Sequence, residues 1–151
     1  MPTKITTELI KELRDATGIS VVQCKNALAE AEGNLEKALA ILKKTSSEIA
    51  LKKVNREVKD GAVMIKIKDK KAVLVSLLCE TDFVSRNNDF TVLLISLADK
   101  AILLGIKKMR EEAKDIIDSI IQKTGENIVL GDSYEISGKI LGSYVNNNKI
   151  A

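Results

Sequence analysis

Apolar residues recur at helical spacing through the first part of the chain, between glycines. The first apolar stripe ends before Gly18 and consists of Ile5, Leu9, Ile10, Leu13 and Ala16. A second helix begins with a capping-box pattern at residues 20–23 (S-V-V-Q) and ends at Gly33, and Asn34 then caps a third helix. Three short helices with tight turns close only a small core. These patterns predict a three-helix module over residues 1–44.

The next segment has a thinner apolar stripe. Residues 45–48 (T-S-S-E) form a second capping-box pattern, which predicts that a new helix begins there. Its apolar positions Ala50, Val54 and Val58 stand among the basic residues Lys52, Lys53, Arg56 and Lys59. A helix with so narrow an apolar face is typical of a connector between units. We therefore expect a helical connector over residues 45–60.

From Gly61 the apolar period changes from helical spacing to alternation, which indicates strands. A hairpin is predicted with its turn at residues 69–71, and its second strand, residues 72–79, is apolar on both faces. Such a strand should lie centrally, with helices covering one side of the sheet. Helices are expected over residues 82–104 and then up to Gly125, followed by strand-like segments at 128–130 and 136–145. The fold class is therefore α+β, with a small antiparallel sheet covered by helices in residues 61–151.

Composition excludes several classes of function. The chain of 151 residues is 45% apolar, 30% charged and 3% aromatic, which is typical of one or two small folded domains. It has no histidine, so Ser-His-Asp and Cys-His catalysis are excluded, and two cysteines cannot build a Cys-rich zinc site. The net charge of +3 and the few aromatic residues argue against direct nucleic-acid binding. We expect no enzyme and no cofactor.

Hydropathy and cysteine use indicate the compartment. No stretch approaches the about 18–20 apolar residues that a spanning helix needs, so no membrane partner is expected. The N-terminal residues M-P-T-K lead into amphipathic sequence without a hydrophobic signal core. Cys24 and Cys79 are far apart, which suggests free thiols in a reducing compartment. These features predict a soluble, cytoplasmic protein.

The junction between the second strand and the following helix carries the most distinctive sequence. In a structural reading, Thr81 caps the helix, Asp82 complements the helix dipole, and Phe83 and Phe90 lie two turns apart on one core face. In a functional reading, this junction is an exposed tip. An enzymatic reading would need an activated thiol at Cys79 or Cys24, but no histidine is present to act as a base.

Here the sequence resembles a known family. Residues 79–87 (C-E-T-D-F-V-S-R-N) are similar to the C-[EQ]-T-D-F-V-[AS]-[RK]-N signature of the bacterial translation elongation factor Ts family. Residues 13–18 and 24–28 resemble its K-E-L-R-x-x-T-G and C-K-x-A-L segments, and residues 125–128 (G-E-N-I) and 141–144 (L-G-S-Y) resemble two further segments. These matches follow the family order over nearly the whole chain.

The resemblance implies a guanine-nucleotide exchange factor that binds the G domain of elongation factor Tu and speeds release of GDP, without covalent chemistry. It also implies that the first domain is ubiquitin-associated-like. In the family, a T-D-F-V tip enters the partner near its magnesium site, so that role falls to Thr81, Asp82, Phe83 and Val84. Phe83 could act as an apolar wedge, while Asp82 disturbs the ligands of a cation that demands octahedral geometry.

The resemblance places a second partner contact on the three-helix module, at Arg14, Val21, Val22 and Lys25. For the two valines the alternative is that at least one is core. Adjacent helical positions point about 100° apart, so burial of both in so small a module is difficult. For Arg14 and Lys25 the alternative is an ordinary solvated charge.

Two departures from the family pattern matter. Asn146 stands where the family commonly has a histidine near the partner's phosphate loop, so that contact loses its charge. Family members usually continue further, so this chain resembles an N-terminal piece or a shortened member. An entering strand at its end would expose an edge and favour self-association. The alternative function is a module that docks on elongation factor Tu without efficient exchange.

Overall fold

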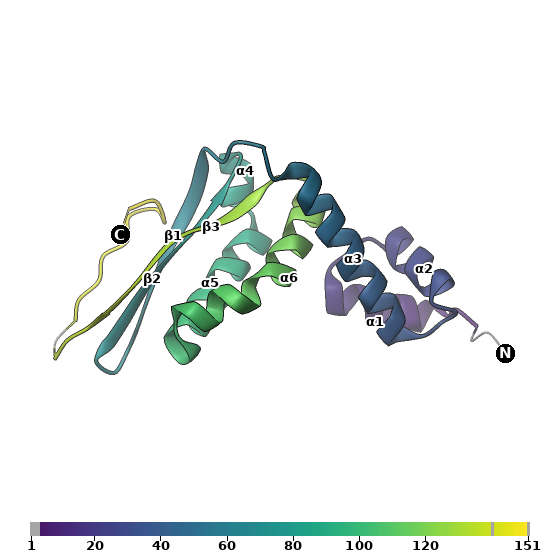
Figure 1. Ribbon diagram of the computed structural model, residues 1–151, viewed down its shortest axis with the longest axis horizontal. Helices are drawn as coiled ribbons and strands as arrows, with labels where there is room; N and C mark the ends of the chain where they lie inside the picture. Colours follow the sequence, from purple (N-terminus) through teal and green to yellow (C-terminus); the bar gives the residue numbers. More distant parts are fainter. Residues whose placement is uncertain (1–3, 140, 151) are drawn as a thin grey trace.

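The structure, a computed structural model, describes residues 4–139 and 141–150, which contain six helices and three strands. Figure 1 shows a helical unit at one end and a sheet with its helices at the other. In chain order, the elements are α1 (Thr7–Thr17), α2 (Val21–Glu30), α3 (Leu35–Lys53), β1 (Asp60–Lys68), β2 (Lys71–Cys79), α4 (Asp82–Ser85), α5 (Asn88–Leu104), α6 (Ile106–Thr124) and β3 (Ile128–Ser137).

The three N-terminal helices begin where the sequence predicts. The Ser20 hydroxyl accepts a hydrogen bond from the Gln23 N–H (3.3 Å), and Asn34 Oδ1 accepts one from the Lys37 N–H (3.0 Å). Each cap satisfies a backbone donor that the first turn leaves free. The helices enclose a small apolar core of Leu13, Ile19, Cys24, Ala27, Leu28, Ala31, Ala38 and Leu42. The predicted three-helix arrangement is confirmed.

Helix α3 does not stop at the predicted boundary. It runs unbroken from Leu35 to Lys53, so the helix start predicted at residues 45–48 is wrong. The Thr45 hydroxyl instead donates to the Ile41 carbonyl (2.9 Å), one helical turn back, and Ser46 is buried against Gln122 of α6. Hydroxyl side chains can satisfy themselves in this way inside a helix. The predicted helical connector is therefore the last part of α3, and it is helical only as far as Lys53.

The sheet has the order β1-β2-β3 and is antiparallel throughout. The predicted hairpin is present, with a turn in which Asp69 has a positive φ of 55°. The pairing of β2 with β3 shifts register between Val75 and Leu77. Gly131 lies at this irregularity, where a Cβ would collide with the Ser76 side chain. The central place predicted for the second strand is confirmed.

The last predicted strand is only partly present. β3 extends through residues 136–137, but residues 138–139 and 141–145 form no strand, and Ile140 lies outside the described residues. Ser137 pairs with Lys71, which is the first residue of β2. Beyond that pair, the Gly138 N–H donates to the Lys70 carbonyl in the hairpin turn (2.9 Å), and the strand pairing ends there.

Helices α5 and α6 cover one face of the sheet and form the larger core with it (Figure 1). Phe90, Leu97 and Met109 are completely buried there. α5 is the most apolar helix. Among the described residues, no helix combines the length and the apolar character needed to cross a bilayer.

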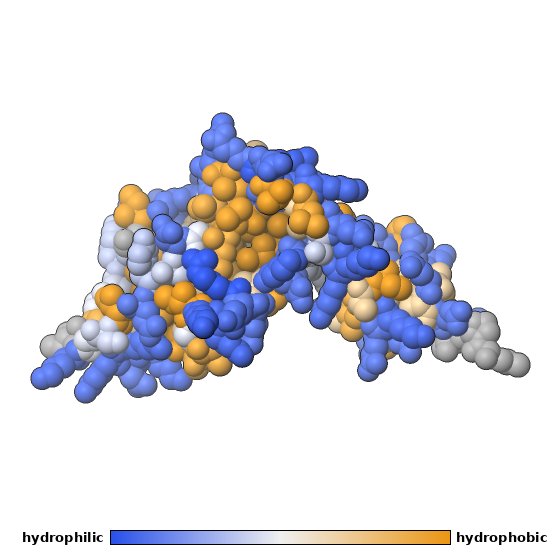
Figure 2. Space-filling view, viewed as in Figure 1, coloured by the Kyte–Doolittle hydropathy of each residue, from blue (hydrophilic) through white to orange (hydrophobic). Residues whose placement is uncertain are grey.

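Helix α3 joins the two units because its C-terminal part packs on α6. The Ser119 hydroxyl of α6 donates to the Thr17 carbonyl at the end of α1 (3.4 Å). Figure 2 shows apolar surface gathered in the middle of the molecule, where α3, α6 and β3 meet. This surface is a shallow groove lined by Ala50, Leu51, Val54, Ile117, Ile121 and Val129.

Candidate functional site

The strand-to-helix junction forms a separate short turn. α4 contains only residues Asp82–Ser85, and Asn87 caps α5 by accepting a hydrogen bond from the Asp89 N–H on its Oδ1 (2.8 Å). The continuous helix predicted over residues 82–104 is therefore interrupted at Arg86 and Asn87. Because of this interruption, the two helices present their side chains in unrelated directions.

The interruption decides where the two phenylalanines lie. Phe90 is fully buried in the larger core, whereas the Phe83 side chain is 84% exposed, so the predicted shared core face is wrong. Asp82 is also exposed, and Val84 is buried beneath the turn. Large exposed apolar side chains are informative because burial normally stabilises them. Residues 81–84, which we call the tip, therefore project one aromatic and one carboxylate side chain into solvent.

Thr81 does not cap α4 in the predicted way. It occupies the N-cap position with extended backbone angles, but its side chain makes no capping hydrogen bond. Its hydroxyl donates to Glu126 Oε2 (2.6 Å) and its backbone N–H donates to Glu126 Oε1 (3.0 Å). Both oxygens of one carboxylate from the α6–β3 junction therefore hold the first residue of the tip.

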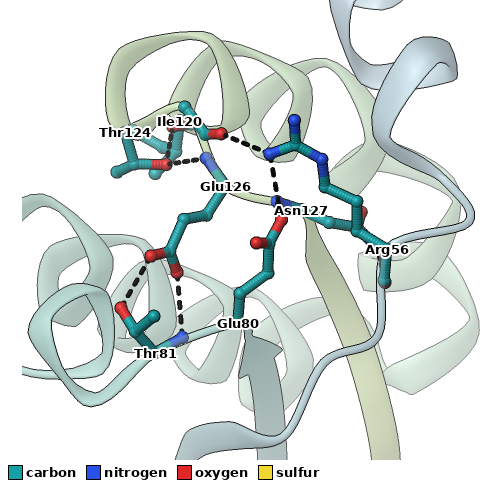
Figure 3. A network of polar contacts seen from close by, with 8 residues as sticks. Arg56, Glu80, Thr81, Ile120, Thr124, Glu126 and Asn127 are labelled. Atoms are coloured by element: carbon teal, nitrogen blue, oxygen red, sulfur yellow. Dashed lines mark hydrogen bonds and ion pairs between the residues drawn. The ribbon is translucent and has the colours of Figure 1, made fainter.

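A second glutamate completes a reciprocal arrangement, shown in Figure 3. Glu80 Oε1 accepts from the Asn127 N–H (2.8 Å) and lies 3.6 Å from Arg56 Nη1. The buried Asn127 side chain donates from Nδ2 to the Arg56 carbonyl (2.9 Å), and Arg56 Nη1 donates to the Gly125 carbonyl (3.3 Å). A glutamate of the β2–α4 junction thus binds the backbone of the α6–β3 junction, and a glutamate of the α6–β3 junction binds the backbone of the β2–α4 junction.

The sequence alone assigns no role to these four residues, which are Arg56, Glu80, Glu126 and Asn127. Three of them lie in segments that resemble the family, Glu80 in residues 79–87 and the other two in residues 125–128, but the resemblance does not say which residues pair. Their partners lie far away along the chain; Thr81 and Glu126, for example, are 45 positions apart. Local spacing carries no information about such pairs.

Cys79 lies directly beneath this network and is not an activated thiol. Its side chain is fully buried, and its Sγ donates to the Thr81 carbonyl (3.2 Å). Burial raises the pKa of the Cys79 thiol to about 11, and the negative charges of Glu126 and Asp60 act in the same direction. A nucleophilic cysteine needs a lowered pKa. Within the described part of the chain, no group of three or more His, Cys, Asp or Glu side chains is placed to hold a metal.

The C-terminal segment lies beside the tip. The Val63 N–H donates to the Asn148 carbonyl (2.7 Å), and Lys149 Nζ donates to the Ser85 hydroxyl of α4 (3.0 Å). Lys149 also contacts the Asp60 carboxylate and lowers the pKa of Asp60 to about 2. Asn146 is exposed on this segment.

The predicted entering strand at the chain end is replaced by a turn with a bridge between Asn146 and Ile150, and Ala151 lies outside the described residues. This turn occupies part of the β1 edge through the Asn148 carbonyl. The self-association that an entering strand would favour stays a prediction.

The predicted contact residues of the three-helix module are all on its surface. Val21 is 46% exposed and Val22 is 66% exposed, so neither valine is core, and Arg14 and Lys25 are exposed as well. The four residues lie at the end of α1 and the start of α2. α3 and α6 separate this surface from the tip (Figure 1), so the structure does not bring the two sets of predicted site residues together.

Comparison with known proteins adds to this picture. A family model described as a UBA-like domain matches residues 6–43. Elongation factor Ts of Marinobacter nauticus is 38% identical, and the match covers 97% of this chain and 53% of that protein. Elongation factor Ts of Buchnera aphidicola is 38% identical, with 99% and 57% covered, and that of Arthrospira platensis is 34% identical, with 97% and 64% covered. The chain thus spans between 53% and 64% of the length of these curated relatives.

Proposed function

Because this chain is a homologue of elongation factor Ts over nearly its whole length, we propose that it is a guanine-nucleotide exchange factor that binds elongation factor Tu and promotes release of GDP. The observation that carries the proposal is the tip, where Phe83 is 84% exposed on a turn held by Val84 and Glu126. The activity needs no cofactor and forms no covalent bond. It takes place in the cytoplasm.

Two side chains of the tip act on the partner. Phe83 inserts as an apolar wedge, because an exposed aromatic ring gains free energy when a pocket covers it. Asp82 interferes with the polar network that holds the partner's magnesium ion, a cation that tolerates little departure from octahedral geometry. Displacement of that ion removes the main counter-charge of the nucleotide phosphates, so GDP dissociates faster.

Linkage makes this mechanism reversible. A factor that weakens nucleotide binding is itself weakened by nucleotide to the same degree. Incoming GTP or GDP therefore releases the factor, and no energy source is required.

In this proposal each of three successive segments of the chain has its own role. Residues 1–44 form a docking domain, which contacts the partner's G domain through Arg14, Val21, Val22 and Lys25. Residues 45–60 connect this domain to residues 61–151, which carry the tip. Asn146 contributes a hydrogen bond on the same side as the tip, since Lys149 holds its segment against α4.

A docking module without exchange activity is the second candidate, favoured by one observation. The chain spans only 53% of the relative from Marinobacter nauticus, so parts of that protein have no counterpart here. Under this candidate the three-helix surface binds elongation factor Tu, while nucleotide release is unchanged.

The test is release of a fluorescent GDP analogue from purified elongation factor Tu, with the chain, with an Asp82→Ala/Phe83→Ala variant and with a Leu103→Ala control. Leu103 is exposed on α5, away from the tip. Acceleration by the chain and the control, but not by the double variant, supports exchange through the tip. Complex formation without acceleration supports the docking candidate, and absence of any complex contradicts both.

A further inference from the structure

The direction of the tip is set from outside it, by Glu126. We propose that Glu126 is a positioning residue, whose two carboxylate oxygens orient Thr81 so that Phe83 and Asp82 point at the partner. This inference rests on the proposed exchange function and adds a residue to it.

The tip has little intrinsic rigidity. α4 is four residues long, and so short a helix is not stable on its own. Its N-cap residue, Thr81, makes no side-chain capping hydrogen bond, which would normally fix the helix start. Val84 anchors the turn from below, and the Thr81 carbonyl accepts hydrogen bonds from the Ser85 N–H (3.2 Å) and from Cys79 Sγ (3.2 Å). These contacts leave the Thr81 N–H and hydroxyl to be oriented by another element, and both donate to Glu126.

Glu126 is built to supply that orientation. It follows Gly125, which ends α6 in the left-handed conformation (φ 77°) and turns the chain toward β3. α6 is packed on both α3 and α5 (Figure 1), so the base of Glu126 is fixed. Two hydrogen bonds that one carboxylate accepts from one residue constrain direction as well as distance, and charged acceptors make such bonds strong.

The sheet and the two cores do not depend on the hydrogen bonds between Glu126 and Thr81. Cys79 pairs with Ile128 in the β2–β3 ladder, and Glu80 separately holds the Asn127 N–H (2.8 Å). Thr81 and Glu126 are only partly buried, so water can solvate their polar groups after a substitution. Loss of Glu126 should therefore leave the sheet and both cores in place while freeing the tip.

The experiment measures GDP-analogue release from elongation factor Tu across a titration of the factor. We expect Glu126→Ala to lower the saturating release rate about tenfold, which corresponds to about 1.4 kcal/mol and is close to the low end of the values for hydrogen bonds to a charged group. The half-saturating concentration should change less than about threefold, because the three-helix contact is untouched. Glu57→Ala, which removes an exposed glutamate beside Lys59, is the matched control and should behave as the unmodified chain.

Substitutions at Thr81 test whether the two residues act together. Thr81→Val removes the hydroxyl and should lower the rate, whereas Thr81→Ser keeps both donors and should lower it less than Thr81→Val does. Glu126→Ala/Thr81→Val should be no slower than Glu126→Ala alone, because the same interaction is already lost. Additive losses in this cycle contradict the proposal, and so does a rate loss that appears only together with a lowered melting temperature.

A measurement without elongation factor Tu separates this inference from the proposed function. Amide hydrogen exchange in the isolated chain should become faster in Glu126→Ala at Thr81 and at Ser85, whose N–H donates to the Thr81 carbonyl (3.2 Å). Unchanged exchange at both amides overturns the positioning role, even if the chain accelerates GDP release. Conversely, if the unmodified chain does not accelerate GDP release but Glu126→Ala shows the faster amide exchange, only the exchange function is contradicted.

Discussion

Phe83 and Phe90 are the only two phenylalanines of the chain, and they lie in opposite environments on either side of the break between α4 and α5. The Phe90 ring is completely buried, whereas the Phe83 ring is 84% exposed. A continuous helix would have carried both rings toward the core. The break at Arg86 and Asn87 therefore makes Phe83 available to a partner.

This contrast predicts that alanine substitutions at the two phenylalanines change the free energy of unfolding by very different amounts. Phe83→Ala should change the free energy of unfolding by less than about 0.5 kcal/mol, because it removes an exposed side chain. Phe90→Ala should lower it by about 3–5 kcal/mol, through lost burial and the cavity left behind. Urea unfolding followed by circular dichroism measures both values. A large loss for Phe83→Ala would show that the ring packs against the fold in solution.

Asp60 and Lys149 predict a pH dependence at the C-terminal segment. Lys149, the Gly61 N–H and Ser85 lower the pKa of Asp60 from 3.8 to about 2. Because the folded-state pKa lies below the unfolded value, the stabilisation is present above pH 3.8 and is lost as the pH falls toward 2. The Asp60 pKa in Lys149→Met, measured by carboxyl NMR titration, should return toward 3.8.

Unfolding measurements at different pH values test the same coupling between Asp60 and Lys149. Lys149→Met should be less stable than the unmodified chain at pH 7, and the difference should shrink as the pH approaches 2. Lys70→Met, at the exposed hairpin turn, serves as the control. A stability difference that does not change with pH would contradict the assigned coupling.

The raised pKa of the Cys79 thiol predicts that the stability of the fold falls at alkaline pH. Burial and nearby negative charges raise the pKa of the Cys79 thiol from 9.0 to about 11, so above pH 9 the unfolded chain loses this proton first. The stability contribution is complete below pH 9 and is lost as the pH rises to 11, with a total of at most roughly 3 kcal/mol. The stability difference between the unmodified chain and Cys79→Ala should therefore narrow over this interval. Parallel curves would show that the thiol titrates normally.

Elements set by neighbouring residues could be predicted from the sequence. The caps at Ser20 and Asn34 and the hairpin turn at Asp69 depend only on side chains a few positions apart, and the structure has all three. The α+β class and the central second strand follow from apolar periodicity, which reports burial directly.

The misread elements depend on distant partners. The pattern at residues 45–48 looks like a helix start, but Ser46 lies against Gln122, 76 residues away, inside a continuous α3. Thr81 looks like a cap for α4, yet Glu126 accepts both of its hydrogen bonds. In each case the hydroxyl has a local and a remote partner of similar chemistry, and tertiary packing decides between them.

The exposed valines of α2 test the proposed docking contact. Val22→Asp should weaken binding to elongation factor Tu at least tenfold, because a charge replaces an apolar side chain in the interface. Stability should change little, since Val22 is 66% exposed. Leu103→Asp on α5 is the matched control, with a side chain 63% exposed outside both proposed contacts. Equal binding by all three proteins in a titration calorimeter would exclude this surface.

Because α3 is unbroken, we predict that the proposed contact surface of the three-helix module and the tip are held rigidly relative to each other. Its N-terminal part belongs to the three-helix core, and its C-terminal part packs on α6. Two side-chain links across the units are the exposed Lys43–Asp115 pair at 4.0 Å and the hydrogen bond from the Ser119 hydroxyl to the Thr17 carbonyl at 3.4 Å. Each contributes about 1 kcal/mol or less, too little to hold the orientation alone. Helix continuity near Lys44 therefore sets the angle between the docking surface and the tip.

Lys44→Pro breaks that continuity, because proline removes one helical hydrogen bond and clashes with the preceding turn, at a cost of about 3 kcal/mol. Two linked contacts bind more tightly than either alone only while their geometry allows simultaneous engagement. The half-saturating concentration for GDP-analogue release should therefore rise at least tenfold, while the saturating rate stays near its normal value because the tip is intact. Lys44→Ala, which keeps the helix, should change neither quantity. An unchanged half-saturating concentration in Lys44→Pro would mean that the two surfaces bind independently of the angle that α3 imposes.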